Sequence, residues 1–167
     1  MPQACPRFLS TLLVMLAAAL AGCAAASPRQ AALEGARGEL VALVFVSHEC
    51  PVANAMVPDL IELAEEAARL DIRFTAVNAT SWADEATMAE HARRFGTEGK
   101  YAVVRDPRQE LARSVGATVV PEAALLRLDG AGGFERLYLG RVNDLYAAIG
   151  RRRAAATTDD LANAMRA

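Results

Sequence analysis

A continuous apolar run over residues 40–46, Leu-Val-Ala-Leu-Val-Phe-Val, constrains the fold of this chain more than any other feature. A run of this length that is apolar on both faces is typical of a central strand in a parallel or mixed sheet. It stops at Ser47-His48-Glu49-Cys50-Pro51, and a helical pattern follows. The sequence therefore predicts a buried central strand that delivers a cysteine to the start of a helix.

Helical and strand patterns alternate along the rest of the chain. Apolar residues recur at three- and four-residue steps over about 53–70, and Pro58 inside this pattern predicts a kink or a strained first turn. Further strands are predicted at residues 72–78, 101–105, 123–128 and 134–138. Further helices are predicted at residues 83–95 with Thr80 or Ser81 as the cap, at 106–116 from Asp106-Pro107, at 143–149 as one or two turns, and from Thr158 to the end.

The order of these elements is β-α-β-α-β-α-β-β-α. Alternation of strands and helices favours crossover units and a parallel core. The glycine-rich segment 129–133 predicts a hairpin loop, so the last two strands add an antiparallel part to the sheet. The expected class is therefore α/β with a mixed central sheet.

The first 22 residues have the features of an export leader. Arg7 supplies a positive charge, residues 8–19 form an apolar run too short for a comfortable membrane span, and small residues precede Cys23. The ending Leu-Ala-Gly-Cys resembles the bacterial lipobox, whose cysteine receives lipid and becomes the mature N-terminus. It implies a protein anchored by lipid at Cys23, on the periplasmic or extracytoplasmic side of the bacterial cell envelope. An ordinary secretory signal cut nearby is the alternative.

Cysteine usage limits the chemistry that the chain can perform. It has three cysteines; Cys5 lies in the leader and Cys23 is the predicted lipid attachment site, so Cys50 is the single free thiol. The mature chain cannot close a disulfide on itself, and any redox cycle must use one sulfur or borrow the thiol of a partner. The formal net charge of −2 predicts no broad basic surface and no nucleic-acid partner.

Three features resemble the thioredoxin-like superfamily. An apolar strand presents Cys50 just before a helix, Pro58 stands where thioredoxins carry the proline of that helix, and Val120-Pro121 precedes the hairpin as their cis-proline does. The resemblance implies a three-layer α/β/α sandwich over residues 39–150, with a C-terminal antiparallel hairpin. It leaves residues 23–38 as a tether and 151–167 as a C-terminal helical extension.

Within that superfamily the chain resembles the redoxin group, which includes the alkyl hydroperoxide reductase and thiol-specific antioxidant proteins. The resemblance rests on Cys50-Pro51-Val52-Ala53-Asn54 and on Gly140-Arg141-Val142-Asn143-Asp144. It implies catalytic roles for one set of residues, namely Cys50, Ser47, Pro121 and Arg141. It implies substrate contacts for a second set, namely Pro51, Asn54 and Val120.

Departures from these families leave several functions open. Ala53 stands where thioredoxins carry a second cysteine, Glu49 where they carry tryptophan, and Leu43 where peroxiredoxins carry proline. One alternative is a peroxidase whose thiolate becomes a sulfenic acid, and another is a mono-thiol disulfide exchanger. Both need an external thiol reductant or a client disulfide as partner.

The position of Cys50 favours chemistry, because the first turn of a helix offers a positive dipole end and unpaired N–H groups that favour the thiolate. The competing interpretation is an inert, buried cysteine in a binding or structural module. A metal-binding form would use His48, Cys50 and Met56, but paired cysteines are missing, and no metal or other cofactor is predicted. His91 is expected to be a surface histidine or a hydrogen-bonded core histidine, and Trp82 is expected to pack in the core or at a helix edge.

Overall fold

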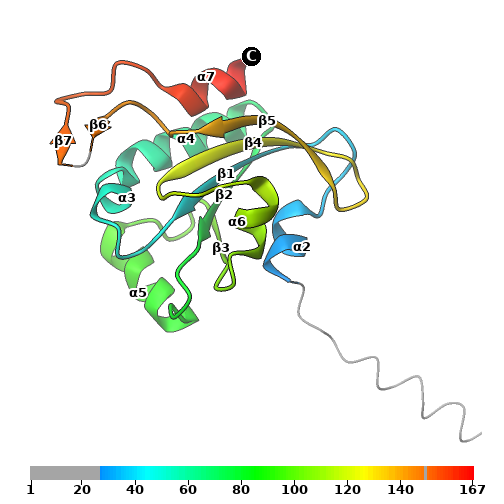
Figure 1. The fold of residues 1–167 in the computed structure, drawn as a ribbon, viewed down its shortest axis with the longest axis horizontal. Coiled ribbons are helices and arrows are strands. Elements are labelled where there is room, and N and C mark those ends of the chain that lie inside the picture. The colour runs from blue at the N-terminus through cyan, green and yellow to red at the C-terminus, as the bar shows by residue number, and fades with distance from the viewer. Residues whose placement is uncertain (1–26, 149) are drawn as a thin grey trace, which may run out of the picture.

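The computed structural model describes residues 27–148 and 150–167, whose fold is shown in Figure 1. A five-stranded mixed sheet has the strand order β3-β2-β1-β4-β5. β1 pairs parallel with β2 and antiparallel with β4, while β3 pairs parallel with β2 and β5 antiparallel with β4. The elements are α2 (Pro28–Leu33), β1 (Leu40–Val46), α3 (Pro51–Ala55), α4 (Val57–Arg69), β2 (Arg73–Asn78), α5 (Glu85–Phe95), β3 (Ala102–Arg105), α6 (Glu110–Val115), β4 (Glu122–Leu128), β5 (Phe134–Gly140), β6 (Tyr146–Ala148), β7 (Arg151–Arg152) and α7 (Asp160–Arg166).

The apolar run over residues 40–46 is the central strand, as the sequence predicts. Its alternate side chains enter two separate cores, because successive residues of a strand point to opposite faces. Ala42 and Val44 pack with α4 and α7 on one face, and Leu43 and Phe45 pack with α2 and α6 on the other. Figure 1 shows these helices on opposite sides of the sheet, which confirms the three-layer prediction.

The helical segment after Cys50 is two helices, not the single kinked helix expected over about 53–70. α3 ends at Ala55 and α4 begins at Val57, with Met56 as the residue between them. Pro58 lies in the first turn of α4, where its missing N–H costs no helical hydrogen bond. The predicted irregularity is thus present and falls just before the proline.

Two predicted helix starts are wrong. The cap of α5 is Asp84, whose carboxylate accepts a hydrogen bond from the Thr87 N–H, and neither Thr80 nor Ser81 takes that place. α6 begins at Glu110 because Asp106 and Pro107 lie in a preceding turn. The carboxylate of Asp106 reaches forward to the N–H groups of Glu110 and Ala112.

Residues 28–33, assigned above to the tether, form the helix α2. A capping box at Ser27 and Gln30 starts it, and Ala32 and Leu33 are buried in the core with α6. The predicted tether is corrected over this stretch, because these apolar side chains complete the packing on one face of the sheet. The predicted leader and Cys23 lie outside the described residues.

The C-terminal part also differs from the expected turns and link. Tyr146–Ala148 is the strand β6 rather than helix, and it pairs with β7 at the predicted basic link. Gly150 has a positive φ of 74° between them, a conformation that ends a helix and suits a tight turn. α7 begins at Asp160, two residues later than predicted, and buries Leu161 in the core.

Among the helices in the described part of the chain, none is both long and apolar enough to cross a bilayer.

Candidate active site around Cys50

The sulfur of Cys50 lies where the central strand ends and the first helix begins. Cys50 is the N-cap of α3 and is only partly exposed, and its own N–H donates to the carbonyl of Ser47 at 3.0 Å. Its carbonyl accepts the Asn54 N–H at 3.0 Å, and Pro51 occupies the first helical turn. The strand therefore fixes a tight turn that presents the thiol beside unpaired N–H groups.

The chain segment before β4 approaches this thiol from the other side. The Val120–Pro121 peptide is cis, as the sequence predicts, and the Cys50 thiol donates to the Val120 carbonyl with an Sγ to O distance of 3.8 Å. Val119 is 61% exposed and Val120 is 37% exposed, so an apolar surface borders the sulfur. Cys50, Val120 and Pro121 are thus brought together from positions far apart in the sequence.

Asn54 ties the turn before Cys50 to α5. Its Nδ2 donates to the carbonyl of His48 at 2.9 Å, which leaves Oδ1 to face Nε2 of His91 at 2.8 Å. An amide oxygen only accepts, so His91 donates from Nε2. Asn54, for which the resemblance implies a substrate contact, therefore supports the turn before Cys50, and His91 is part of the same network.

The ring of His48 is held on two sides. Its Nδ1 lies 3.5 Å from Nδ2 of Asn78, which is 1% exposed, and its ring meets Trp82 edge-on at a centroid distance of 4.7 Å. The buried Nε2 of His48 has no hydrogen-bond partner among the described residues. The expected packing role of Trp82 is only partly correct, because its side chain is 60% exposed.

Burial lowers the pKa of His91 from its ordinary value of 6.5, and the neighbouring His48 and Arg94 lower this pKa further. Its ring also packs against Phe95 with centroids 4.5 Å apart. The neutral form of His91 is therefore favoured in the folded chain.

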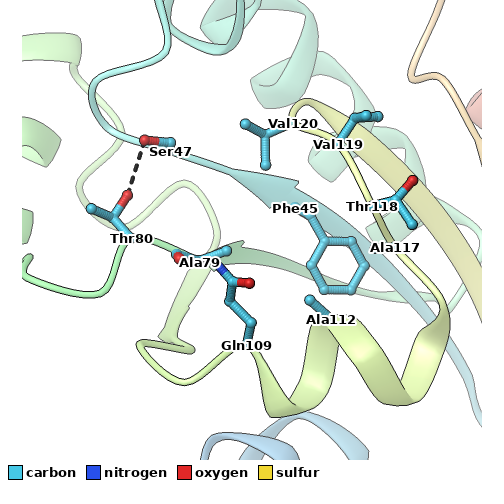
Figure 2. A pocket seen from close by; sticks show the side chains of 10 residues that line it. All are labelled: Phe45, Ser47, Ala79, Thr80, Gln109, Ala112, Ala117, Thr118, Val119 and Val120. Carbon is cyan, nitrogen blue, oxygen red and sulfur yellow. Dashed lines mark hydrogen bonds between the residues drawn. The ribbon is translucent and has the colours of Figure 1, made fainter.

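A cavity of about 310 Å³ adjoins the site on the α6 side of the sheet. Figure 2 shows Ser47 and Thr80 joined by a hydrogen bond of 2.9 Å at one side of it, with Val120 and Phe45 nearby. Its lining residues are Phe45, Ser47, Ala79, Thr80, Gln109, Ala112, Ala117, Thr118, Val119 and Val120. The cavity therefore shares Val120 with the surroundings of the thiol.

Two predicted catalytic residues have other partners. The Ser47 hydroxyl bonds Thr80 and accepts the N–H of Glu49 at 3.3 Å. The Arg141 guanidinium pairs with Asp160 of α7, with Nε 2.7 Å from Oδ2. Within the described chain, neither side chain forms a hydrogen bond or ion pair with Cys50 that would support the predicted catalytic role.

The residues proposed for the metal-binding alternative, His48, Cys50 and Met56, do not form a set of metal ligands in the described structure. Met56 is 3% exposed and belongs to the core with α4, so it is not available beside Cys50. Within residues 27–148 and 150–167, no group of three or more His, Cys, Asp or Glu side chains could hold a metal ion.

Sequence reasoning missed the contributions of Thr80, His91 and Trp82 to this site. Thr80 and Trp82 follow β2, which runs parallel to β1, and the carboxyl ends of parallel strands lie at one edge of a sheet. That topological rule could have found both residues. His91 contacts Asn54 because of the way α5 packs beside the Cys50 turn, and no pattern in the sequence predicts that packing.

A parallel–antiparallel sheet between two helical layers, with a cysteine starting a helix beside a cis-proline, defines the thioredoxin-fold class. The model of the thioredoxin-like family matches residues 38–131, and the chain belongs to this family. No curated protein matches the sequence.

Solved structures share this fold at low sequence identity. An uncharacterized conserved protein from Geobacillus kaustophilus is 18% identical with a TM-score of 0.58, covering 74% of this chain and 63% of that one. MTB DsbF is 18% identical with a TM-score of 0.51, covering 78% and 81%. A secreted Mycobacterium tuberculosis disulfide oxidoreductase homologous to E. coli DsbE is 20% identical with a TM-score of 0.50, covering 81% and 84%. The chain spans less than two thirds of the length of the Geobacillus protein.

Proposed function

We propose that this chain is a lipid-anchored, single-cysteine thiol-disulfide exchange protein of the bacterial cell envelope. The observation that carries the proposal is the position of the Cys50 sulfur, partly exposed at the start of α3 and 3.8 Å from the Val120 carbonyl. The exposed Val119 and Val120 beside it offer an apolar docking surface for the chain of a client protein. The structurally similar secreted protein from Mycobacterium tuberculosis is named a disulfide oxidoreductase, which agrees with this chemistry.

The exchange uses one sulfur and an external thiol. The Cys50 thiolate attacks one sulfur of a client disulfide, forms a mixed disulfide, and releases the other client sulfur as a thiolate. A second thiolate, from the client or from a reductant, then attacks the mixed disulfide and restores Cys50. Each step breaks one S–S bond and forms another, so the chain itself undergoes no net oxidation over the cycle.

Disulfide exchange fits the site better than peroxide reduction. A thiol peroxidase benefits from donors that stabilise the departing oxygen, because charge develops there as the O–O bond breaks. Ser47 and Arg141, the predicted donors, are bonded to Thr80 and Asp160. The redoxin-type peroxidase is therefore the second candidate, and it differs by forming a sulfenic acid on Cys50.

The anchor belongs to the same proposal. Cys23 follows a charged start and a short apolar run, and lipid on that cysteine would hold the domain at the membrane. The partners are then an external thiol reductant or a client disulfide outside the cytoplasm.

The test uses a chain in which Cys5→Ser and Cys23→Ser leave Cys50 as the only thiol, whether or not the leader is removed. Incubation with oxidised glutathione at neutral pH is expected to add one glutathionyl group, detected by mass spectrometry, and dithiothreitol should remove it. Cys50→Ser in the same background is the control and should gain nothing. A rate no faster than that of the urea-unfolded chain would show an inert cysteine, and a dimedone adduct formed with peroxide but no glutathionyl adduct would favour the peroxidase.

A further inference from the structure

We infer that the space between α5 and the sheet is a binding site for a small, neutral ring compound that carries a hydroxyl group. A cavity of about 220 Å³ lies there. It is on the face of the sheet opposite the cavity beside Val120, because Ala76 lines it and the adjacent Val77 packs in the core with α6. This site is separate from Cys50, so the inference goes beyond the proposed exchange of thiols.

The sheet forms the floor of this cavity. Val46 of β1 is aligned with Asn78 of β2, and Ala76 of β2 is aligned with Val103 of β3. Aligned residues and residues two apart in a strand share one face, so these four side chains form a continuous surface below α5. The remaining lining residues are Met88, Ala89, His91, Ala92, Thr97 and Tyr101.

α5 forms the roof without filling the space. None of its side chains is buried, and Ala89 and Ala92 are two of the four residues that it contributes to the lining. The Asn78 Nδ2 donates to the sulfur of Met88 at 2.7 Å and so joins floor and roof. Because protein interiors contain few voids larger than a water molecule, an empty space of this size costs stability, and an occupant would restore the missing contacts.

The lining favours an apolar, uncharged occupant. Six of the ten lining residues are Val, Ala or Met, and none is Asp, Glu, Lys or Arg. A charge placed there would lose its hydration without gaining a partner of opposite charge. A cavity of roughly 150 Å³ with apolar walls stays dry and takes up benzene, so this larger one has room for a ring with a substituent.

His91 supplies a hydrogen-bond acceptor in the wall. Its Nε2 donates to Oδ1 of Asn54 at 2.8 Å, and burial lowers its pKa, so the ring is neutral and its Nδ1 is the acceptor atom. The other polar group of the wall near it, the Asn78 amide, is already engaged, with Nδ2 on Met88 and Oδ1 accepting the Thr80 N–H at 2.9 Å. A ligand hydroxyl therefore matches His91, and one such group on an apolar ring is typical of small-molecule sites.

The experiment titrates the chain that carries Cys5→Ser and Cys23→Ser with 4-fluorophenol and follows the probe by fluorine NMR. Saturable binding is expected, and phenol should compete for it. Fluorobenzene lacks the hydroxyl and should bind several-fold more weakly, because it forms no hydrogen bond with His91. The charged 4-fluorobenzoate should show no saturable binding.

Two variants place the binding in this cavity. Ala92→Leu fills the space and should weaken the binding of 4-fluorophenol by about tenfold or more. Ala86→Leu is the matched control, since Ala86 is an exposed residue of α5 outside the lining, and should leave the affinity unchanged. His91→Phe keeps a ring but removes the acceptor, and should lower the affinity for 4-fluorophenol to that for fluorobenzene.

The inference is overturned by an absence of saturable 4-fluorophenol binding, by equal binding in Ala92→Leu, or by equal binding of 4-fluorobenzoate. Urea unfolding of each variant shows whether it is folded, and His91→Phe provides the decisive comparison if Ala92→Leu is not. The glutathione reaction of Cys50 tests the proposed function separately, because Cys50 does not line this cavity.

Discussion

The side chain of Asn54 holds two parts of the site together. It donates to the His48 carbonyl and accepts from His91, so one amide joins the Cys50 turn to α5. Asn54 could be singled out from the sequence because it lies one helical turn after Cys50. His91 could not, because its partner is 37 residues away and depends on how α5 packs.

Asn54→Ala should lower the free energy of unfolding by about 1–3 kcal/mol, since two partly buried polar partners lose a hydrogen bond. The same change should slow the reaction of Cys50 with oxidised glutathione, because the turn before the thiol loses its support. Urea unfolding and stopped-flow kinetics measure the two effects. His91→Ala removes only one of the bonds and is the matched control; equal losses in both variants would mean that the bond to His48 contributes nothing.

The lowered pKa of His91 makes stability depend on pH. Since the folded chain binds this proton less readily than the unfolded chain, the unfolded state takes up more protons as pH falls below about 6.5. Stability is therefore complete above this pH and declines on acidification toward the lower folded pKa. His91→Gln keeps a donor for Asn54 and should flatten the profile between pH 7 and 5 in urea titrations. An unchanged slope would assign the pH dependence to another group.

The start of α6 depends on a carboxylate that precedes it. Asp106 is 1% exposed and accepts the N–H groups of Glu110 and Ala112, two of the donors that a helix leaves unpaired at its start. The sequence indicated a helix in this region but placed its start at Asp106-Pro107, four residues before the observed start at Glu110. A side chain that reaches forward across a turn looks the same in sequence as an ordinary cap.

Asp106→Ala should destabilise the chain by about 2 kcal/mol, because it leaves two helix N–H groups without an acceptor. Asp106→Asn keeps one carbonyl acceptor and should cost less. Chemical denaturation followed by circular dichroism measures both. Because α6 also lines the cavity beside Val120, the alanine variant should slow the thiol exchange as well, and an identical stability for both variants would contradict this account.

Across the whole molecule, the strands were predictable and the two ends of the domain were not. β1 to β5 follow from apolar runs and alternation that local sequence carries. α2 and β6 were missed because short segments take their conformation from the surfaces that they cover. The carboxylate of Asp144, 4% exposed, accepts from Thr157 and Thr158, and these bonds hold its pKa far below the usual range. This cluster fastens the C-terminal segment to the sheet domain.

The last helix is thereby part of the core, although the sequence suggested an extension. Leu161 is fully buried in the same core cluster as the apolar side chains of α4, and its N–H donates to the Val142 carbonyl at 3.0 Å.

Leu161→Ala should lower the free energy of unfolding by about 2–5 kcal/mol, the range for a cavity left in a packed core. Leu137→Ala is the matched control, since Leu137 is 38% exposed and should change stability by no more than about 0.5 kcal/mol. A loss at Leu161 as small as that at Leu137, measured by urea unfolding, would show that residues after 150 are dispensable for folding. A large loss with one cooperative transition would mean that α7 unfolds together with the strand that carries Cys50.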